Sequence, residues 1–150
     1  MTMPEEHTYK LSLNWDEGRI GTLKSDDLEE SVKVATPPEF PGGVEGVWSP
    51  EHLYVASVSS CFMTSFLAIA DFSKLEYENL SIESEGLLSK SDGKYVMSKI
   101  TLRPVLVITD PNQESKAHRL LEKADQICLI TRSIKSEVVV EPVVEVSVKT

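Results

Sequence analysis

The feature that most constrains the fold is a long apolar segment that follows a clear helix-start signal. Ser49-Pro50-Glu51 supplies a favoured N-cap, a proline suited to the first helical position and an acidic side chain that complements the helix dipole. The residues that follow, Leu53 to Ala70, are apolar on nearly every side of a helix. Because such a helix avoids water, the segment predicts a buried central helix from residue 49 to about residue 71.

Hydroxyl and thiol side chains interrupt this segment and decide between two interpretations of it. They are Ser57, Ser59, Ser60, Cys61, Thr64 and Ser65. A membrane-spanning helix needs about 20 consecutive, predominantly apolar residues, so a buried helix of a globular domain is the better interpretation. The run from Ser57 to Ser60 lowers helix propensity and predicts a kink or a break just before Cys61.

Alternating and β-branched segments predict strands on both sides of this helix. They are Tyr9–Trp15, Arg19–Lys24, Ser31–Thr36, Asn79–Lys90, Lys94–Ile108 and Glu137–Lys149. Asp92-Gly93 is a hairpin turn signal, and Asp110-Pro111 starts a second helix. One face of that helix carries Ala117, Leu120, Leu121, Ala124 and Cys128. The order predicts a single α+β domain over residues 1–150, in which two main helices cover an antiparallel sheet.

The charge balance excludes two classes of partner. The chain carries 24 acidic and 15 basic residues, a net charge of −9, and it has no basic run. Nucleic-acid binding depends mainly on Lys and Arg contacts with phosphate, and an acidic surface repels anionic membranes, so we expect neither nucleic acid nor membrane as a partner. Small-molecule chemistry or protein partners remain. The N-terminal residues have neither the basic nor the apolar region of a signal peptide, so we expect a cytoplasmic protein.

The chain has two cysteines, Cys61 and Cys128, each in an apolar segment that is predicted to be helical. In a cytoplasmic protein we expect thiols rather than a structural disulfide. A reactive thiol needs a neighbouring cation or a helix N-terminus that lowers its pKa. Arg19 is a permanent cation whose planar fork can hold the carboxylate of Glu51 and still face a thiolate. These four residues are therefore the candidate site.

Simpler interpretations of the same residues stay open. Free cysteines are among the most buried residue types and often act as small hydrophobes. Arg19 beside a turn is commonly a solvated charge, and Glu51 in the first helical turn is commonly a partner of the dipole. In one continuous helix Glu51 and Cys61 would lie about 15 Å apart along the axis, so their meeting requires a fold-back, a helix break or a second chain. The sequence has no metal-ligand spacing, phosphate-binding loop or serine nucleophile motif, and we expect no cofactor.

Two motifs and a hairpin resemble a known family. The motifs are Ser49-Pro50-Glu51-His52-Leu53 leading through Ala56 to Ser60-Cys61-Phe62, and Ala124-Asp125-Gln126-Ile127-Cys128. Together with Gly18-Arg19-Ile20-Gly21 before Gly42-Gly43, they resemble the OsmC/Ohr family, the osmotically inducible and organic hydroperoxide resistance proteins. The resemblance covers roughly residues 11–148. Trp48 and the apolar stretch Ile127–Thr131 indicate a less characterised branch.

The resemblance implies a function and an assembly. In that family a peroxidatic cysteine attacks the peroxide and a resolving cysteine closes an intramolecular disulfide, and Cys61 and Cys128 match these two in that order. An Arg–Glu pair stabilises the thiolate there, and Arg19 and Glu51 match it by position. The family also implies an intertwined homodimer with two long central helices back to back and active sites at the interface.

We therefore expect a thiol-dependent peroxidase of the oxidative stress response. It would reduce organic hydroperoxides with electrons from a lipoyl- or thioredoxin-type dithiol. Phe62, Met63 and Phe66 near Cys61 favour an alkyl or lipid-like peroxide over hydrogen peroxide. Two alternatives stay open: a non-catalytic small-ligand binder with the same fold, and a structural dimer with buried thiols.

Overall fold

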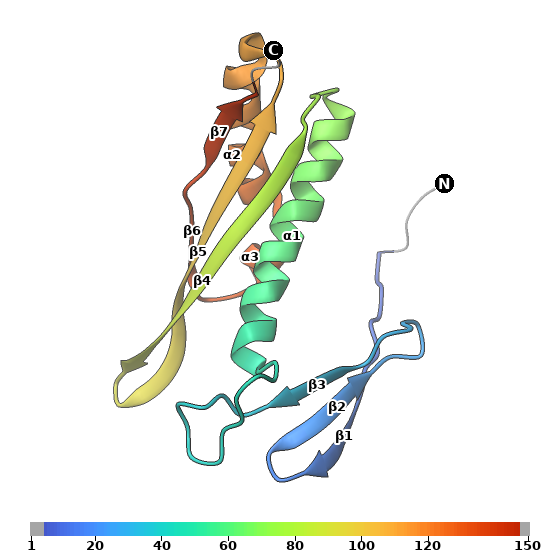
Figure 1. Ribbon diagram of the computed structural model, residues 1–150, viewed down its shortest axis with the longest axis vertical. Helices are drawn as coiled ribbons and strands as arrows, with labels where there is room; N and C mark the ends of the chain where they lie inside the picture. The colour runs from blue at the N-terminus through green and yellow to red at the C-terminus, as the bar shows by residue number, and fades with distance from the viewer. Residues whose placement is uncertain (1–4, 148–150) are drawn as a thin grey trace. The chain divides into compact units, whose positions relative to one another are not determined.

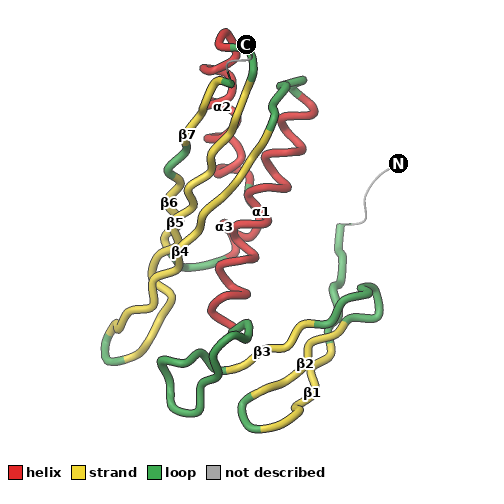
Figure 2. Tube along the Cα trace, viewed as in Figure 1, coloured by secondary structure: helices red, strands yellow, loops and turns green. Residues whose placement is uncertain are grey.

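The computed structural model describes residues 5–147, which divide into two units between Leu53 and Tyr54 (Figures 1 and 2). The first unit contains β1 (Ser12–Glu17), β2 (Ile20–Lys24) and β3 (Val32–Ala35), which pair antiparallel in that order. At the β1–β2 turn, the carbonyl of Gly18 accepts a hydrogen bond from the Trp15 indole. The three strands predicted in this part of the chain are confirmed, with slightly shifted ends.

The second unit is built on a four-stranded sheet. β4 (Asn79–Ser91) and β5 (Lys94–Ile108) form a long antiparallel hairpin closed by Asp92 and Gly93, both with positive φ. β6 (Glu137–Val140) and β7 (Val143–Val146) each pair with β5, and both pairs are parallel. The α+β class is confirmed, but the prediction of a wholly antiparallel sheet is wrong for these two strands.

The connection between β5 and β6 explains the parallel pairing. The chain leaves the end of β5, passes through helices and returns along the same strand, and such a crossover gives a parallel pair. Glu141 and Pro142 then separate β6 from β7, because proline cannot donate a ladder hydrogen bond. The single strand predicted from Glu137 is therefore two strands. Val148 and Lys149, at its predicted end, lie outside the described residues.

The two main helices, α1 (Pro50–Phe72) and α2 (Glu114–Ile127), lie on one face of the four-stranded sheet (Figure 1). A 3₁₀ turn (Pro111–Gln113) precedes α2, and the short α3 (Leu129–Ser133) follows it. The core consists mainly of Val58, Phe62, Phe66 and Ala70 from α1, Ile100, Leu102, Leu106 and Ile108 from β5, and Ala117, Leu120, Leu121 and Ala124 from α2. The buried residues of α1 and α2 recur every three or four positions, and those of β5 recur every second position. Each set therefore lies on one face of its element.

α1 is uninterrupted, so the break predicted at Ser57–Ser60 is wrong. The Ser57 hydroxyl donates to the carbonyl of Tyr54 at 2.7 Å, and the Ser60 hydroxyl donates to the carbonyl of Ala56 at 2.7 Å. These bonds satisfy the hydroxyls within the helix. By length and composition α1 resembles a membrane-spanning helix, a property that it shares with the core helices of soluble proteins. Its buried residues, Val58, Phe62, Phe66 and Ala70, pack in the core, but much of the rest of the helix is uncovered within one chain, so the prediction of a buried helix holds for one face only.

A left-handed residue ends α1 and gives a prediction about stability. Lys74 has a φ of 58°, its N–H donates to the Asp71 carbonyl, and the N–H of Leu75 donates to the Ala70 carbonyl. Glycine is preferred at this position of a helix C-cap. We expect Lys74→Gly to raise the free energy of unfolding by about 0.5–1 kcal/mol, the left-handed penalty of a side chain less the extra entropy of glycine in the unfolded chain.

Urea denaturation measures this gain. Lys74→Ala is the control, because it removes the charge of Lys74 and keeps the left-handed penalty. An equal gain in Lys74→Ala would assign the effect to the lysine charge and contradict the conformational explanation.

Candidate active site

Two thiols from distant parts of the sequence meet in the second unit. Cys61 lies within α1, and Cys128 lies between α2 and α3, just beyond the helical face on which it was predicted. Both are free thiols; Cys61 is half-buried, and Cys128 is buried with 1% of its surface exposed. Their side chains hydrogen-bond to each other. The structure therefore brings together the two cysteines that the sequence put forward as a pair.

The end of α2 positions Cys128. The apolar face of α2 fixes that helix in the core, which α1 also lines. The helix ends at Ile127, Cys128 is extended with φ −62° and ψ 111°, and α3 begins at Leu129. The first N–H groups of a helix have no partner inside it. In this chain two of those groups bind the Cys61 sulfur.

The surroundings of Cys61 favour its thiolate. Burial of this thiol opposes ionisation, but hydrogen bonds outweigh burial and lower the pKa of Cys61. The backbone N–H groups of Ile130 and Leu129, the Cys128 thiol and the Ser65 hydroxyl all bind this sulfur. A donor that binds the charged form of an acid more strongly than the neutral form lowers its pKa. The site therefore increases the share of Cys61 that is thiolate, the form suited to nucleophilic attack.

Cys128 has the opposite tendency. Burial raises the pKa of the Cys128 thiol, the hydroxyl and backbone of Thr131 act against this, and the neighbouring Cys61 raises the pKa further. The other groups that bind the Cys61 sulfur are N–H and O–H donors, so that sulfur is the acceptor. When Cys61 is ionised, the proton between the two sulfurs therefore belongs to Cys128.

The lowered pKa of Cys61 gives a prediction about its reactivity. The thiolate is the form that reacts with iodoacetamide. Because the pKa of Cys61 is lowered, its thiolate persists to lower pH than the thiolate of an ordinary cysteine. We expect Ser65→Ala to shift the midpoint of the alkylation profile upward by about 0.5–1 pH unit, which corresponds to the loss of one hydrogen bond.

Mass spectrometry of Cys61 alkylation against pH measures this shift. Ser60→Ala is the matched control, because the Ser60 hydroxyl donates to the Ala56 carbonyl. Equal shifts in the two variants, or no shift in Ser65→Ala, would contradict a role of the Ser65 hydroxyl.

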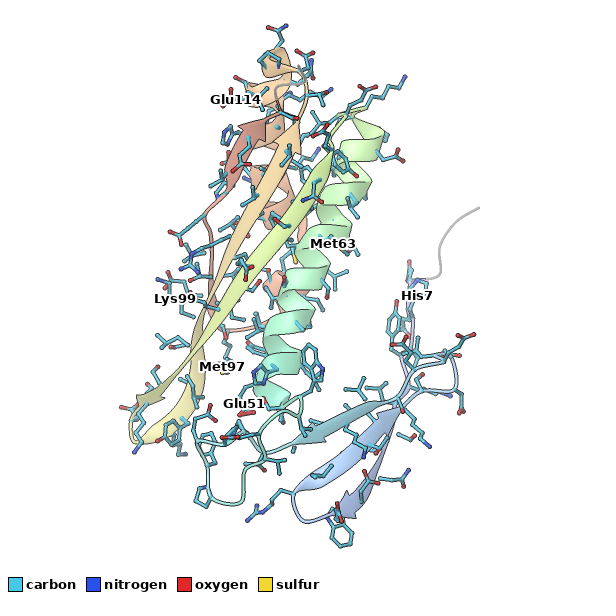
Figure 3. The ribbon with its side chains drawn as sticks, viewed as in Figure 1. His7, Glu51, Met63, Met97, Lys99 and Glu114 are labelled. Atoms are coloured by element: carbon cyan, nitrogen blue, oxygen red, sulfur yellow. The ribbon has the colours of Figure 1, made fainter. Side chains whose placement is uncertain are left out.

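Arg19 and Glu51 belong to the first unit. Arg19 is exposed at the β1–β2 hairpin and, with Trp15 and Ile20, lines a cavity of about 500 Å³. Glu51 lies half-buried in the first turn of α1 (Figure 3). Within the described part of the chain, the ion pairs involve Arg103, and none joins Arg19 to Glu51. Their part in the site stays a prediction.

Two aromatic residues near Cys61 in sequence do not lie at the surface beside it. Phe62 and Phe66 are fully buried in the core, so the preference for an alkyl or lipid-like peroxide that was expected from apolar residues near Cys61 has no support from these two. Side chains of successive helical residues point about 100° apart. Closeness to Cys61 in sequence therefore does not place the side chains of Phe62 and Phe66 on the same side of α1 as Cys61. Met63 is 39% exposed (Figure 3), and Leu129, next to Cys128, is 64% exposed. These exposed apolar side chains flank the cysteines in the sequence.

The sequence interpretation missed the donors that bind the Cys61 sulfur. Ser65 was recoverable, because it follows Cys61 by one helical turn, the spacing at which helical side chains meet. The N–H groups of Leu129 and Ile130 were not, because they act as donors only through the helix boundary beside Cys128. Across residues 5–147, no group of three or more His, Cys, Asp or Glu side chains is arranged to hold a metal ion.

Comparison with known proteins identifies the family. The family described as OsmC-like protein matches residues 43–143, a range that contains Glu51, Cys61 and Cys128. The chain belongs to the OsmC-like family. The resemblance and the OsmC-like fold expected from the motifs are thus confirmed.

Individual relatives agree with this membership of the OsmC-like family. Uncharacterized protein YmaD of Bacillus subtilis is 33% identical, over 96% of each chain. Organic hydroperoxide resistance protein-like 2 of Staphylococcus saprophyticus is 28% identical, over 93% of this chain and 96% of its own. The structure of an OsmC-like protein of unknown function from Vibrio cholerae has a TM-score of 0.83 at 26% identity, over 92% of this chain and 100% of that chain.

Proposed function

We propose that this OsmC-like protein is a thiol-dependent peroxidase that reduces organic hydroperoxides. The observation that carries the proposal is the thiol pair: a half-exposed Cys61 whose pKa is lowered, in contact with a buried Cys128. A low-pKa, accessible thiol beside a second cysteine is the arrangement that reversible thiol oxidation requires. The Staphylococcus relative named for organic hydroperoxide resistance supports the choice of substrate.

The proposed cycle has three steps. The Cys61 thiolate attacks an oxygen of the hydroperoxide, releases an alcohol and becomes a sulfenic acid. Cys128 then condenses with the sulfenic acid to give a disulfide and water. An external lipoyl- or thioredoxin-type dithiol reduces that disulfide by thiol–disulfide exchange. This cycle requires no metal or organic cofactor, and we place it in the cytoplasm.

Arg19 and Glu51 complete the proposed site in a homodimer. Because α1 is uninterrupted, the proposal takes the remaining one of the three ways in which Glu51 could meet Cys61, which is a second chain. We propose an intertwined dimer of single-domain chains, in which one chain supplies this Arg–Glu pair to the thiols of the other. The guanidinium of Arg19 would then stabilise the Cys61 thiolate and be oriented by Glu51.

Steady-state consumption of peroxide tests the function. We expect turnover with a bulky alkyl hydroperoxide to exceed turnover with hydrogen peroxide, with lipoyl- and thioredoxin-type donors compared in parallel. Arg19→Ala and Arg19→Lys should both slow the reaction, because lysine lacks the bidentate fork. Arg119→Ala, at an exposed position of α2, is the control. Consumption equal to that of the dithiol alone would refute the peroxidase proposal and favour a non-catalytic binder.

The proposed dimer gives a prediction about thermal stability. In α1, only 22% of the most apolar 18-residue window is buried within one chain. Met63 is part of the exposed remainder, and Phe72, at the end of the helix, is 90% exposed. Burying a large apolar side chain is worth about 2 kcal/mol, so association should stabilise the folded chain and the melting temperature should rise with protein concentration.

Analytical ultracentrifugation and melting curves over a hundredfold range of protein concentration provide the measurement. We expect Phe72→Ser to weaken this concentration dependence. A well-folded monomer at micromolar concentration would contradict both the dimer and a site that two chains share.

A further inference from the structure

The proposed reaction needs a proton that the thiol pair is placed to supply. When a thiolate attacks a hydroperoxide R–O–O–H, the O–O bond breaks, the hydroxyl stays on sulfur and R–O⁻ leaves with the electron pair. An alkoxide is a strong base and a poor leaving group. A group that donates a proton to it as the bond breaks lowers the barrier, and such general acids contribute about 10²- to 10⁴-fold in rate.

The donors around the Cys61 sulfur differ in their ability to give up a proton. Backbone N–H groups, such as those of Leu129 and Ile130, hold theirs under all ordinary conditions. The Ser65 hydroxyl is a far weaker acid than a thiol, whose ordinary pKa is about 8.5. Cys128 therefore carries the most readily transferred proton in contact with the reacting sulfur, and at 1% exposure it is shielded from exchange with water.

The direction of the sulfur–sulfur hydrogen bond places that proton. The Cys61 sulfur accepts from the N–H groups at the start of α3 and from Ser65, so Cys128 donates and Cys61 accepts. In the transition state the leaving oxygen lies two bonds from the Cys61 sulfur. The Cys128 thiol is thus a donor of a transferable proton in contact with one of the reacting atoms.

We propose that Cys128 is the general acid that protonates the departing alkoxide, before it acts as the resolving thiol. The inference rests on the proposed peroxidase function. In the first step, Cys61–S⁻ and R–O–O–H give Cys61–S–OH and R–O⁻. The alkoxide takes the Cys128 proton, which gives R–OH and Cys128–S⁻. This thiolate attacks the sulfenic sulfur, forms the S–S bond and expels hydroxide, so the single negative charge is conserved. The proton transfer thus creates the nucleophile of the next step.

Three single-turnover reactions of Cys61 test this role, each followed as loss of the Cys61 thiol. An alkyl hydroperoxide releases an alkoxide, which needs a proton. A peroxy acid releases a carboxylate, which needs none at neutral pH because the pKa of a carboxyl group is about 4. Iodoacetamide releases iodide and reports how much thiolate is present and whether the site is folded. Dividing each peroxide rate by the alkylation rate of the same variant removes changes in the pKa of Cys61.

We expect Cys128→Ala to lower the normalised rate with alkyl hydroperoxide by about a hundredfold and to leave the normalised rate with peroxy acid unchanged. Ser65→Ala, the matched control, also removes a donor to the Cys61 sulfur, and it should change all three rates in parallel. In Cys128→Ser the new side chain has nearly the size of the natural one but is a much weaker acid. This variant should show the same selective loss, and it replaces Cys128→Ala if that variant fails to alkylate normally.

The outcomes separate this inference from the function on which it rests. A normalised alkyl hydroperoxide rate that is unchanged without Cys128, or an equal loss with peroxy acid, overturns the acid role and leaves the peroxidase proposal standing. A natural protein whose Cys61 does not react with stoichiometric hydroperoxide overturns both.

Discussion

Cys61→Ser is expected to reduce hydroperoxide consumption to the background of the dithiol alone. A serine hydroxyl is not ionised at neutral pH, whereas the thiolate is the attacking species in the proposed cycle. The substitution changes one atom at a half-buried position, so circular dichroism and the melting temperature should stay close to those of the natural protein. Near-normal turnover in this variant would remove Cys61 from the mechanism.

Cys128→Ser is the matched comparison for that experiment. Without a resolving thiol, Cys61 should react once and stop as a sulfenic acid or a more highly oxidised form. Mass spectrometry of the trapped product distinguishes this single reaction from full turnover. Sustained turnover in Cys128→Ser would show that another thiol resolves the intermediate.

The largest expected effect on stability lies in the loop that follows β3. A Cβ atom at Gly43 would lie 2.0 Å from the carbonyl oxygen of Pro37 and 2.7 Å from the Cα of Pro38. Both are backbone atoms, so no side-chain rotation relieves the overlap. We expect Gly43→Ala to destabilise the first unit by about 3 kcal/mol, the upper range for overpacking.

Gly46→Ala is the control within the same loop. Gly46 has a φ of 78° and no atom within 4 Å of its added Cβ, so it tests the left-handed penalty alone, about 1–2 kcal/mol. Both tryptophans, Trp15 and Trp48, belong to the first unit, so their fluorescence during urea denaturation reports on this unit. Equal losses in the two variants would contradict the close approach at Gly43.

Local chemistry made parts of the fold predictable. The helix start at Ser49-Pro50 depends on capping within one turn, and the β4–β5 hairpin depends on Asp92-Gly93. Both are confirmed, with α1 at Pro50–Phe72 and β4 and β5 on either side of the turn. The direction of β6 and β7 was not predictable in this way, because a β-branched strand has the same pattern in parallel and antiparallel pairs. The crossover through α2 and α3 decides it.

The candidate site also has parts that the sequence predicted and parts that it did not. The motifs around Cys61 and Cys128 predicted their pairing, and the structure places the two side chains in contact. The sequence also assigned thiolate stabilisation to Arg19 with Glu51, which stays a prediction. The donors described at the Cys61 sulfur come instead from backbone amides, Ser65 and Cys128 itself. A backbone N–H occurs at every residue except proline, so only the break between two helices shows which N–H groups are free to bind a ligand.

The 67 positions between the two cysteines link redox chemistry to the stability of the chain. In the proposed cycle a disulfide closes this long loop, which contains β4, β5 and α2. The chain-entropy model gives such a cross-link about 4 kcal/mol of stabilisation. By thermodynamic linkage the same free energy resists reduction and corresponds to about 90 mV at roughly 30 mV per 1.4 kcal/mol. The oxidised form would therefore be both harder to unfold and harder to reduce, so regeneration of the two thiols would require a strongly reducing dithiol.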